Sequence, residues 1–125
     1  MTESRHVARP GVGLISVGWM GKLHTKAYQA LPLTYPELGI QPRLVVAADT
    51  EPTRARYAVD VLGYASGTTD YADVLANPEV DVVSICAPNF LHAEMGVAAA
   101  EAGKHFWIEK PVGRGHEEAR AVARA

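Results

Sequence analysis

A short glycine-containing turn carries the clearest chemical signal in this sequence. Residues 16–21 read SVGWMG and overlap the end of the apolar run 12–17. The spacing matches the G-x-G-x-x-G pattern of dinucleotide-binding turns, with Ser16 in the place of the first glycine. Gly18 would let a pyrophosphate approach the backbone, and Gly21 would let the next helix pack closely on the strand. Free N–H groups at the start of that helix would then face the phosphates.

Two other nucleotide-binding patterns fit this turn less well. A P-loop would need a glycine where Ser16 stands, and Ser or Thr at Leu23 to hold magnesium, so ATP hydrolysis is disfavoured. A methyltransferase-type G-x-G-x-G turn would need glycine at Met20. In the dinucleotide interpretation Ser16 is tolerated if its φ angle stays negative, which is our expectation here.

An acidic residue ends the second apolar run. Asp49 can accept hydrogen bonds from both hydroxyls of an adenosine ribose and would repel a 2′-phosphate, which favours NAD over NADP. Its separation from the glycine turn exceeds the usual distance of about 20 residues, and a Pro-rich loop accounts for the excess. Thr50 follows it as a further candidate contact, and Arg54 or Arg56 could still accommodate the phosphate of NADP. The alternative is a surface aspartate that leads into a turn before Pro52.

Apolar runs that alternate with helical patterns must position these residues. Such alternation is typical of an α/β protein with a parallel sheet covered by helices. The predicted strands are 12–17, 43–48, 64–66, 82–87 and 105–108. The predicted helices run from the glycine turn to about Leu31, over 52–62, from Thr69 or Asp70 to Leu75, from an Asn89 cap to Ala102, and over 115–125. We therefore predict a doubly wound (Rossmann) sheet of strand order 3-2-1-4-5, with helices on both faces.

Composition and length restrict the remaining possibilities. The 125 residues suit one domain, and 48% hydrophobic residues with a net charge of −2 argue against disorder and against a nucleic-acid-binding face. We expect no membrane span, because no run approaches about 20 apolar residues. With no export signal, we expect a cytoplasmic protein. We expect a disordered leader over 1–10, a loop over 32–42 and a dinucleotide-binding domain over 11–125.

The one cysteine and the scattered acids give no metal signal. Cys86 lies among apolar neighbours, so we expect a buried thiol rather than a nucleophile. A single cysteine forms neither an internal disulfide nor a thiolate cluster. We therefore expect no metal site.

Three further segments, in order with Asp49, resemble the Gfo/Idh/MocA family of NAD(P)-dependent oxidoreductases. They are the strand and turn GLISVGWMG followed by His24, the stretch VDVVSICAPNFLH, and the stretch AGKHFWIEKP. The resemblance covers roughly residues 12 to 113, and the E-K-P tripeptide in this order is its most specific part. Two departures are Ser16 for the first glycine and Ala87 where many relatives have Thr before Pro-Asn.

The resemblance implies a role for each matching residue. The glycine turn would bind the pyrophosphate, and Asp49 the adenosine ribose. The segment from Pro88 to His92 would lie beside the nicotinamide ribose, and the Lys110 ammonium would reach nicotinamide and substrate. There it would lower the pKa of a substrate hydroxyl and stabilise the alkoxide. We predict Lys110 as catalytic. The predicted cofactor-binding residues are Ser16, Gly18, Trp19, Met20, Gly21, Asp49, Thr50, Ala87, Pro88, Asn89, His92, Glu109 and Lys110.

Three of these interpretations have structural alternatives. Lys110 could be a solvated lysine at a strand end, and His92 could pack on Trp107 at the start of a helix. Trp19 could cover a cofactor or pack between loops. His24 is expected to be structural.

The resemblance implies a hydride-transferring oxidoreductase that acts on a sugar, inositol or similar polyol with NAD, or with NADP as the other option. Such a reaction also needs the family's C-terminal substrate domain, which 125 residues cannot hold. We therefore expect the cofactor domain alone, without catalytic competence by itself. The alternative is a stand-alone dinucleotide-binding module that acts as a sensor or assembly part. A homo-oligomer stays open.

Overall fold

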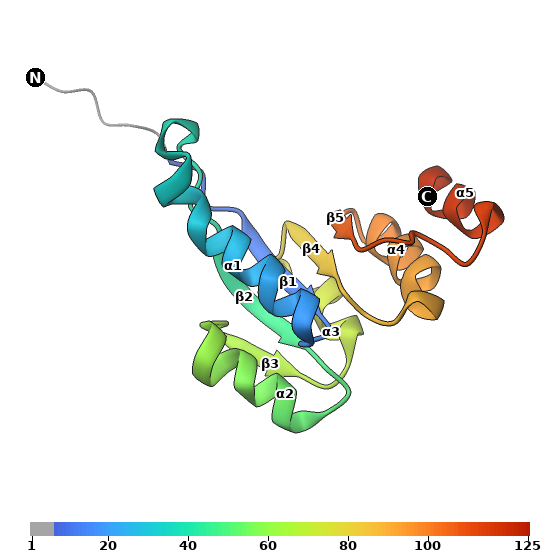
Figure 1. Cartoon of the computed structure of the whole chain (residues 1–125), viewed down its shortest axis with the longest axis horizontal. Coiled ribbons are helices and arrows are strands. Elements are labelled where there is room, and N and C mark those ends of the chain that lie inside the picture. The colour runs from blue at the N-terminus through green and yellow to red at the C-terminus, as the bar shows by residue number, and fades with distance from the viewer. Residues whose placement is uncertain (1–6) are drawn as a thin grey trace, which may run out of the picture.

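The computed structural model describes residues 7–125 and has one parallel sheet at its centre (Figure 1). The strands are β1 (Gly11–Ile15), β2 (Arg43–Ala48), β3 (Ser66–Thr68), β4 (Val82–Ile85) and β5 (His105–Ile108). Every paired strand runs parallel, in the order β3-β2-β1-β4-β5. The predicted doubly wound topology is therefore confirmed, with β1 and its following turn at the centre.

Helices connect the strands. They are α1 (Trp19–Thr34), α2 (Pro52–Tyr57) with a π-helical extension η2 (Ala58–Leu62), α3 (Tyr71–Ala76), α4 (His92–Glu101) and α5 (His116–Arg124). Short 3-10 turns η1 (Pro36–Leu38) and η3 (Asn89–Leu91) complete the chain. No helix within residues 7–125 is both long enough and apolar enough to cross a bilayer.

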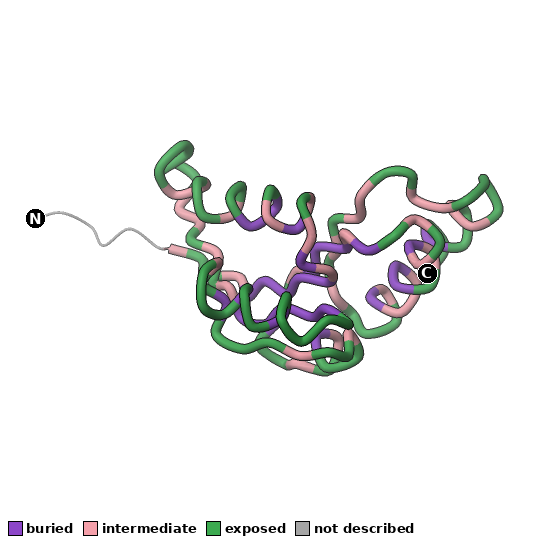
Figure 2. Tube along the Cα trace, turned by 60° about the horizontal axis from the view of Figure 1, so that its bottom comes forward, coloured by how far each residue is buried: buried purple, intermediate pink, exposed green. Residues whose placement is uncertain are grey.

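The sheet is packed on both faces, as the alternation along β1 shows. Val12 and Leu14 belong to a cluster with Ala58 of η2 and Tyr64, against which Tyr28 of α1 packs. Ile15 points to the other face, where it packs with side chains of α3 and α4. Because successive strand residues face opposite sides, a strand buried on both faces reads as a continuous apolar run. Figure 2 shows the buried segments gathered between the outer helices.

The segment 32–42 is partly helical, which corrects the expected loop. Helix α1 continues through Pro32 to Thr34, and the 3-10 turn η1 follows. Pro32 lies in the last turn of α1, where its missing N–H removes one helical hydrogen bond. The Tyr35 amide still donates to the Leu31 carbonyl at 2.9 Å, which closes the turn around the proline.

The chain before β1 is also more ordered than expected. Ala8 forms a parallel bridge with Ile40, and the Pro10 carbonyl accepts from the Arg43 amide at 2.8 Å. These backbone hydrogen bonds hold residues 8–10, which lie within the expected disordered leader over 1–10. The expectation for residues 1–6 lies outside the described residues.

Three strands, β1, β3 and β4, begin or end at other residues than expected. Strand β3 begins at Ser66, because Tyr64 turns into the core and is 2% exposed. Strand β1 ends at Ile15 and β4 at Ile85, both before the predicted ends. Just after β4, the Cys86 amide donates to the Ile15 carbonyl at 3.0 Å, which links the ends of the two strands. The loops that could hold a ligand therefore begin earlier.

Candidate functional site

The glycine turn joins β1 to α1 at the carboxyl edge of the sheet. A Cβ added at Gly18 would meet no heavy atom within 4 Å, so the space in front of this backbone is open. A Cβ at Gly21 would clash with the Ser16 carbonyl oxygen and would lie 3.3 Å from a Leu14 methyl group. The structure thus separates two reasons for glycine. Gly21 allows close packing of helix and strand, and Gly18 leaves room for a ligand.

Ser16 adopts a positive φ angle of 79°, which corrects the expected negative value. A serine side chain is strained in this left-handed region by about 1–2 kcal/mol. The Ser16 amide donates to the Ala48 carbonyl of β2 at 2.8 Å, which anchors the turn to the neighbouring strand. The turn therefore needs the backbone shape of the glycine pattern even where the sequence departs from it.

Helix α1 begins with Gly18 as its N-cap and has no side-chain cap. The amide of Lys22 donates to the Gly18 carbonyl at 3.0 Å, which closes the first helical turn. The preceding amides at this helix start are available to an anion, and the helix dipole favours negative charge there. Trp19 is 75% exposed, so it is not packed between loops. Met20 is half-buried beside it.

Asp49 is buried at the end of β2, where its carboxylate contacts the glycine turn. Its Oδ2 accepts from the Val17 amide and its Oδ1 from the Glu51 amide, each at 2.9 Å. Each carboxylate oxygen has a second lone pair, so both can still accept from a ligand hydroxyl. Asp49 therefore fixes the shape of the turn, whereas its expected contact with a ribose stays a prediction.

A pocket of about 520 Å³ opens at this edge of the sheet. Its lining includes five residues that the sequence predicted for the cofactor, which are Ser16, Asp49, Thr50, Ala87 and Pro88. The first three come from the ends of β1 and β2, and the other two follow β4. The pocket therefore spans the position where the strand order reverses, which is where ligands bind in doubly wound sheets.

Most of the other lining residues were missed by sequence reasoning. They include Thr69, Asp70 and Tyr71 before and at the start of α3, and Phe90, Leu91 and Met95 around the start of α4. They belong to two separate connections, between β3 and α3 and between β4 and α4, which only the fold brings together. Arg54, considered as a contact for a 2′-phosphate, also lines the pocket, whereas Arg56 does not.

The loop after β4 holds an unpartnered polar atom. Asn89 was expected to cap the next helix, but it begins the turn η3, and α4 has no side-chain cap. Its Oδ1 is buried without a hydrogen-bond partner. Because buried polar groups are nearly always paired, a ligand hydroxyl or amide near Asn89 would complete this atom's bonding.

His92 is enclosed at the start of α4 and is 2% exposed. Its Nε2 lies 2.6 Å from the Ala87 carbonyl oxygen, and its Nδ1 lies 2.6 Å from that of Pro111. The alternative in which His92 packs on Trp107 is wrong, because His24 stacks on that indole. His92 thus ties the loop after β4 to the segment after β5, with both ring nitrogens already engaged.

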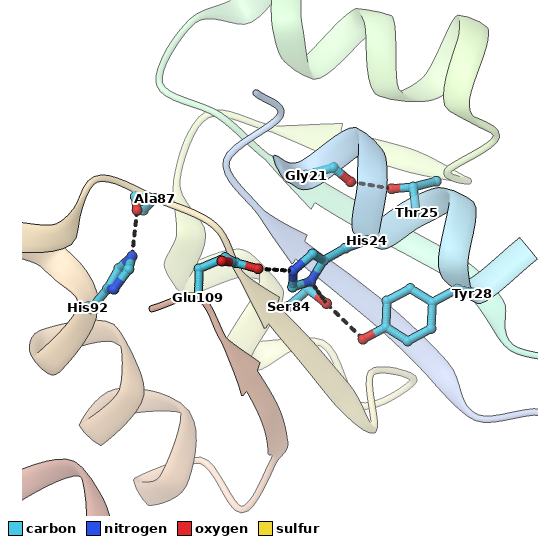
Figure 3. Close-up of polar contacts among 8 residues, drawn as sticks. All are labelled: Gly21, His24, Thr25, Tyr28, Ser84, Ala87, His92 and Glu109. Carbon is cyan, nitrogen blue, oxygen red and sulfur yellow. Dashed lines mark hydrogen bonds and ion pairs between the residues drawn. The ribbon is translucent and has the colours of Figure 1, made fainter. Parts of the chain in front are cut away.

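A line of polar side chains crosses from α1 to β4 and β5 (Figure 3). The Tyr28 hydroxyl lies 2.7 Å from Ser84 Oγ, and that atom lies 3.0 Å from His24 Nδ1. On the other side of the ring, His24 Nε2 lies 2.8 Å from Glu109 Oε1. Burial raises the pKa of Tyr28, which keeps its hydroxyl protonated. His24 is structural, as expected, but it also reaches one of the predicted site residues.

The hydrogen bond from His24 is the largest of several effects that hold the pKa of Glu109 below its ordinary value. The Glu109 amide donates to the Ile85 carbonyl at 3.0 Å, which anchors the segment to β4. Lys110 follows with an exposed side chain, and within residues 7–125 no hydrogen bond or ion pair engages its ammonium. The adjacent residues Glu109 and Lys110 therefore differ: the carboxylate is paired with His24, and the ammonium is exposed and free.

Two further observations concern the Cys86 thiol and the side chains that could bind a metal. Burial, with a smaller contribution from the Glu109 charge, raises the pKa of the Cys86 thiol to about 12, which suits an unreactive thiol. Within the described part of the chain, no group of three His, Cys, Asp or Glu side chains could hold a metal ion.

The topology, the glycine turn and the acid after β2 define a dinucleotide-binding domain of the Rossmann class. The chain belongs to the Gfo/Idh/MocA family, described as an oxidoreductase family with an NAD-binding Rossmann fold, whose model matches residues 11–125. The resemblance noted from sequence is thus confirmed, and NAD is the cofactor of this domain family.

Similar proteins agree with this assignment. A levoglucosan dehydrogenase of Pseudarthrobacter phenanthrenivorans is 42% identical over 111 residues, which is 89% of this chain and 28% of that protein. An inositol 2-dehydrogenase of Rhizobium meliloti is 33% identical over 87% of this chain and 30% of its own length. A solved levoglucosan dehydrogenase in complex with NADH and L-sorbose superposes with a TM-score of 0.90, at 40% identity, over 94% of this chain and 32% of that one. The chain therefore spans about a third of the proteins that it matches.

Proposed function

We propose that this chain holds NAD(H) across the carboxyl ends of its strands as the cofactor half of a sugar or polyol dehydrogenase. The open space before Gly18, beside the uncapped start of α1, carries this proposal. A pyrophosphate needs both a close approach to the backbone and unpaired amides, and this turn offers the two together.

The adenosine half would occupy the pocket beside Asp49. The carboxylate has free lone pairs for the ribose hydroxyls, and its negative charge disfavours a 2′-phosphate. Thr50 and the aromatic Phe90 line the same pocket, with space for a purine. We propose NAD as the preferred cofactor. NADP is the second option because Arg54 lines the pocket close to the same strand end.

The nicotinamide half would lie over the ends of β4 and β5. The unpartnered Oδ1 of Asn89 supports a contact with the nicotinamide ribose or its amide. His92 would act indirectly by holding Ala87 and Pro111 in place. Bound NAD accepts or supplies the hydride. The Lys110 ammonium would stabilise negative charge on the substrate oxygen and is the catalytic residue of this proposal.

The substrate class rests on the relatives. Proteins named levoglucosan dehydrogenase and inositol 2-dehydrogenase support a cyclic sugar or polyol as the substrate. A second domain would have to complete the substrate pocket, because this chain matches only about a third of each relative. A cytoplasmic location and the oligomeric state stay predictions from sequence.

Calorimetric titration of the chain with NADH, NADPH and S-adenosylmethionine tests the proposal. We expect NADH to bind most tightly, NADPH more weakly and S-adenosylmethionine not at all. Binding of S-adenosylmethionine alone would overturn the dinucleotide proposal. A levoglucosan or inositol assay of the same sample separates two functions, because turnover by this chain alone would contradict the need for a second domain.

A further inference from the structure

A buried histidine links the helix after the glycine turn to the segment that carries Lys110. His24 lies on α1 one turn beyond Gly21 and is 1% exposed. Burying an imidazole is costly unless its polar atoms are paired, and here both ring nitrogens are paired with side chains. The Glu109 partner lies 85 positions away in the sequence. Such a long-range pair fixes the two segments relative to each other.

The partners of the His24 ring allow a consistent set of hydrogen-bond donors and acceptors. The pKa of Glu109 is lowered, first by the hydrogen bond from His24, so its carboxylate accepts and His24 Nε2 donates. The Ser84 hydroxyl can then donate to His24 Nδ1 while the Tyr28 hydroxyl donates to Ser84 Oγ. All three hydrogen bonds can then run in one direction, from Tyr28 to Glu109, and Figure 3 shows the three contacts.

An aromatic side chain keeps the ring in this orientation. Trp107 stacks on the His24 ring with centroids 3.6 Å apart and an interplanar angle of 21°. Tyr28 meets the same indole edge-on at 5.9 Å. Rotation of the imidazole would break the stack and both hydrogen bonds together. The Nε2–H group is therefore aimed at Glu109 with little freedom.

The position of the Glu109 carboxylate bears on the next residue, Lys110. The Glu109 amide donates to the Ile85 carbonyl at 3.0 Å, which holds the main chain next to Lys110. Because His24 holds the carboxylate on the α1 side, it is not paired with the Lys110 ammonium. Among residues 7–125 no acid pairs with that ammonium, which stays available to a ligand.

We propose that His24 is a positioning residue for the nicotinamide end of the site. It holds the Glu109 carboxylate away from the Lys110 ammonium, so that this ammonium is free. Without the His24 donor, the carboxylate would turn toward the neighbouring ammonium and neutralise it. The inference rests on the proposed function, because it requires the nicotinamide to lie over the ends of β4 and β5.

Comparing NADH with ADP-ribose tests this role, because ADP-ribose carries no nicotinamide. We expect His24→Phe, which can keep the stack on Trp107, to weaken NADH binding about tenfold, as expected for losing a charge-assisted hydrogen bond. ADP-ribose affinity should change less than about twofold, within the scatter of distant substitutions. The matched control is Tyr64→Phe, which removes a buried hydrogen bond to Thr25 of the same helix, and both affinities should stay unchanged. Calorimetry measures each affinity.

Equal loss of both ligands in His24→Phe would show a merely structural role and overturn the proposal, as would unchanged NADH affinity. Glu109→Ala removes the carboxylate that would neutralise the ammonium, so we expect it to weaken NADH less than His24→Phe does and to relieve the loss in the double variant. If His24→Phe does not fold, Ser84→Ala carries the test, with a smaller selective loss of NADH affinity. Failure of the wild-type chain to bind either ligand would instead overturn the proposed function.

Discussion

The glycine turn and the side chains beneath the ends of β4 and β5 build the two halves of the site in different ways. Residues 16–21 use backbone shape, with open space at Gly18 and a close contact at Gly21. The second region, which we call the β4–β5 cluster, consists of Tyr28, Ser84, His24, Trp107 and Glu109. It uses side chains joined by hydrogen bonds and stacking. In the glycine turn, the size of a substituted side chain decides its effect, whereas in the β4–β5 cluster each chemical group matters. Substitutions in the two regions should therefore have different effects.

The largest effect should separate the two glycines of one turn. Gly21→Val places a side chain against the Ser16 carbonyl, and we expect it to destabilise the fold by about 3 kcal/mol. Gly18→Val meets open space, so stability should change little while NADH binding is lost. Thermal unfolding by circular dichroism and a fluorescence titration with NADH measure the pair. Retained NADH affinity in Gly18→Val would place the phosphates elsewhere.

Removal of the acid after β2 should change cofactor preference. We expect Asp49→Ser to weaken NADH at least about tenfold more than NADPH, because charged hydrogen bonds to the ribose are lost. Both ligands should lose some affinity, since Asp49 also accepts from the Val17 amide of the turn. Asp60→Ser, an exposed acid on η2, is the matched change in charge. An unchanged NADH to NADPH ratio would remove Asp49 from the ribose site.

The strained residue of the turn should respond in the opposite direction. Ser16→Gly relieves a left-handed φ of 79°, and we expect about 1 kcal/mol of added stability. That gain corresponds to a rise in melting temperature of about 4 °C. Ser66→Gly is the control, since Ser66 lies in strand β3, where glycine should cost stability. A lower melting temperature in Ser16→Gly would mean that the serine side chain, rather than the backbone shape, supports the turn.

The smallest effect concerns pH and the β4–β5 cluster. The folded-state pKa of Glu109 lies below its ordinary value of 4.5, so its contribution is present above that value and is lost as pH falls below it. We expect the wild-type chain to lose more stability than Glu109→Gln between neutral pH and the acid side of 4.5. Denaturant unfolding at several pH values measures the difference. Glu117→Gln, at an exposed position, should lose as much stability at acid pH as the wild type does. An equal loss in Glu109→Gln would contradict the contact with His24.

The sequence predicted the backbone half of the site better than the side-chain half. The turn 16–21 and Asp49 are local patterns next to strands, and the parallel topology placed them at one edge. The positive φ of Ser16 was missed because the sequence alone does not show how the turn is held to β2.

The β4–β5 cluster could not be predicted in the same way. Its members come from α1, β4 and the end of β5, and no spacing relates His24 to Ser84 or Glu109. The packing of Trp107 on His24 rather than on His92 likewise depends on the positions of whole helices. The start of α4 was misjudged for a related reason, because Asn89 forms a 3-10 turn before the helix. The tertiary fold, rather than local propensity, sets these contacts.

Mapping amide NMR shifts during titration with NADH and with ADP-ribose tests the two-part site most directly. We predict that ADP-ribose shifts the amides of the glycine turn and of residues around Asp49, and that NADH additionally shifts those around Asn89 and Lys110. Shifts from NADH that avoid residues 16–21, or a shift pattern identical for the two ligands, would contradict a dinucleotide that lies across both regions.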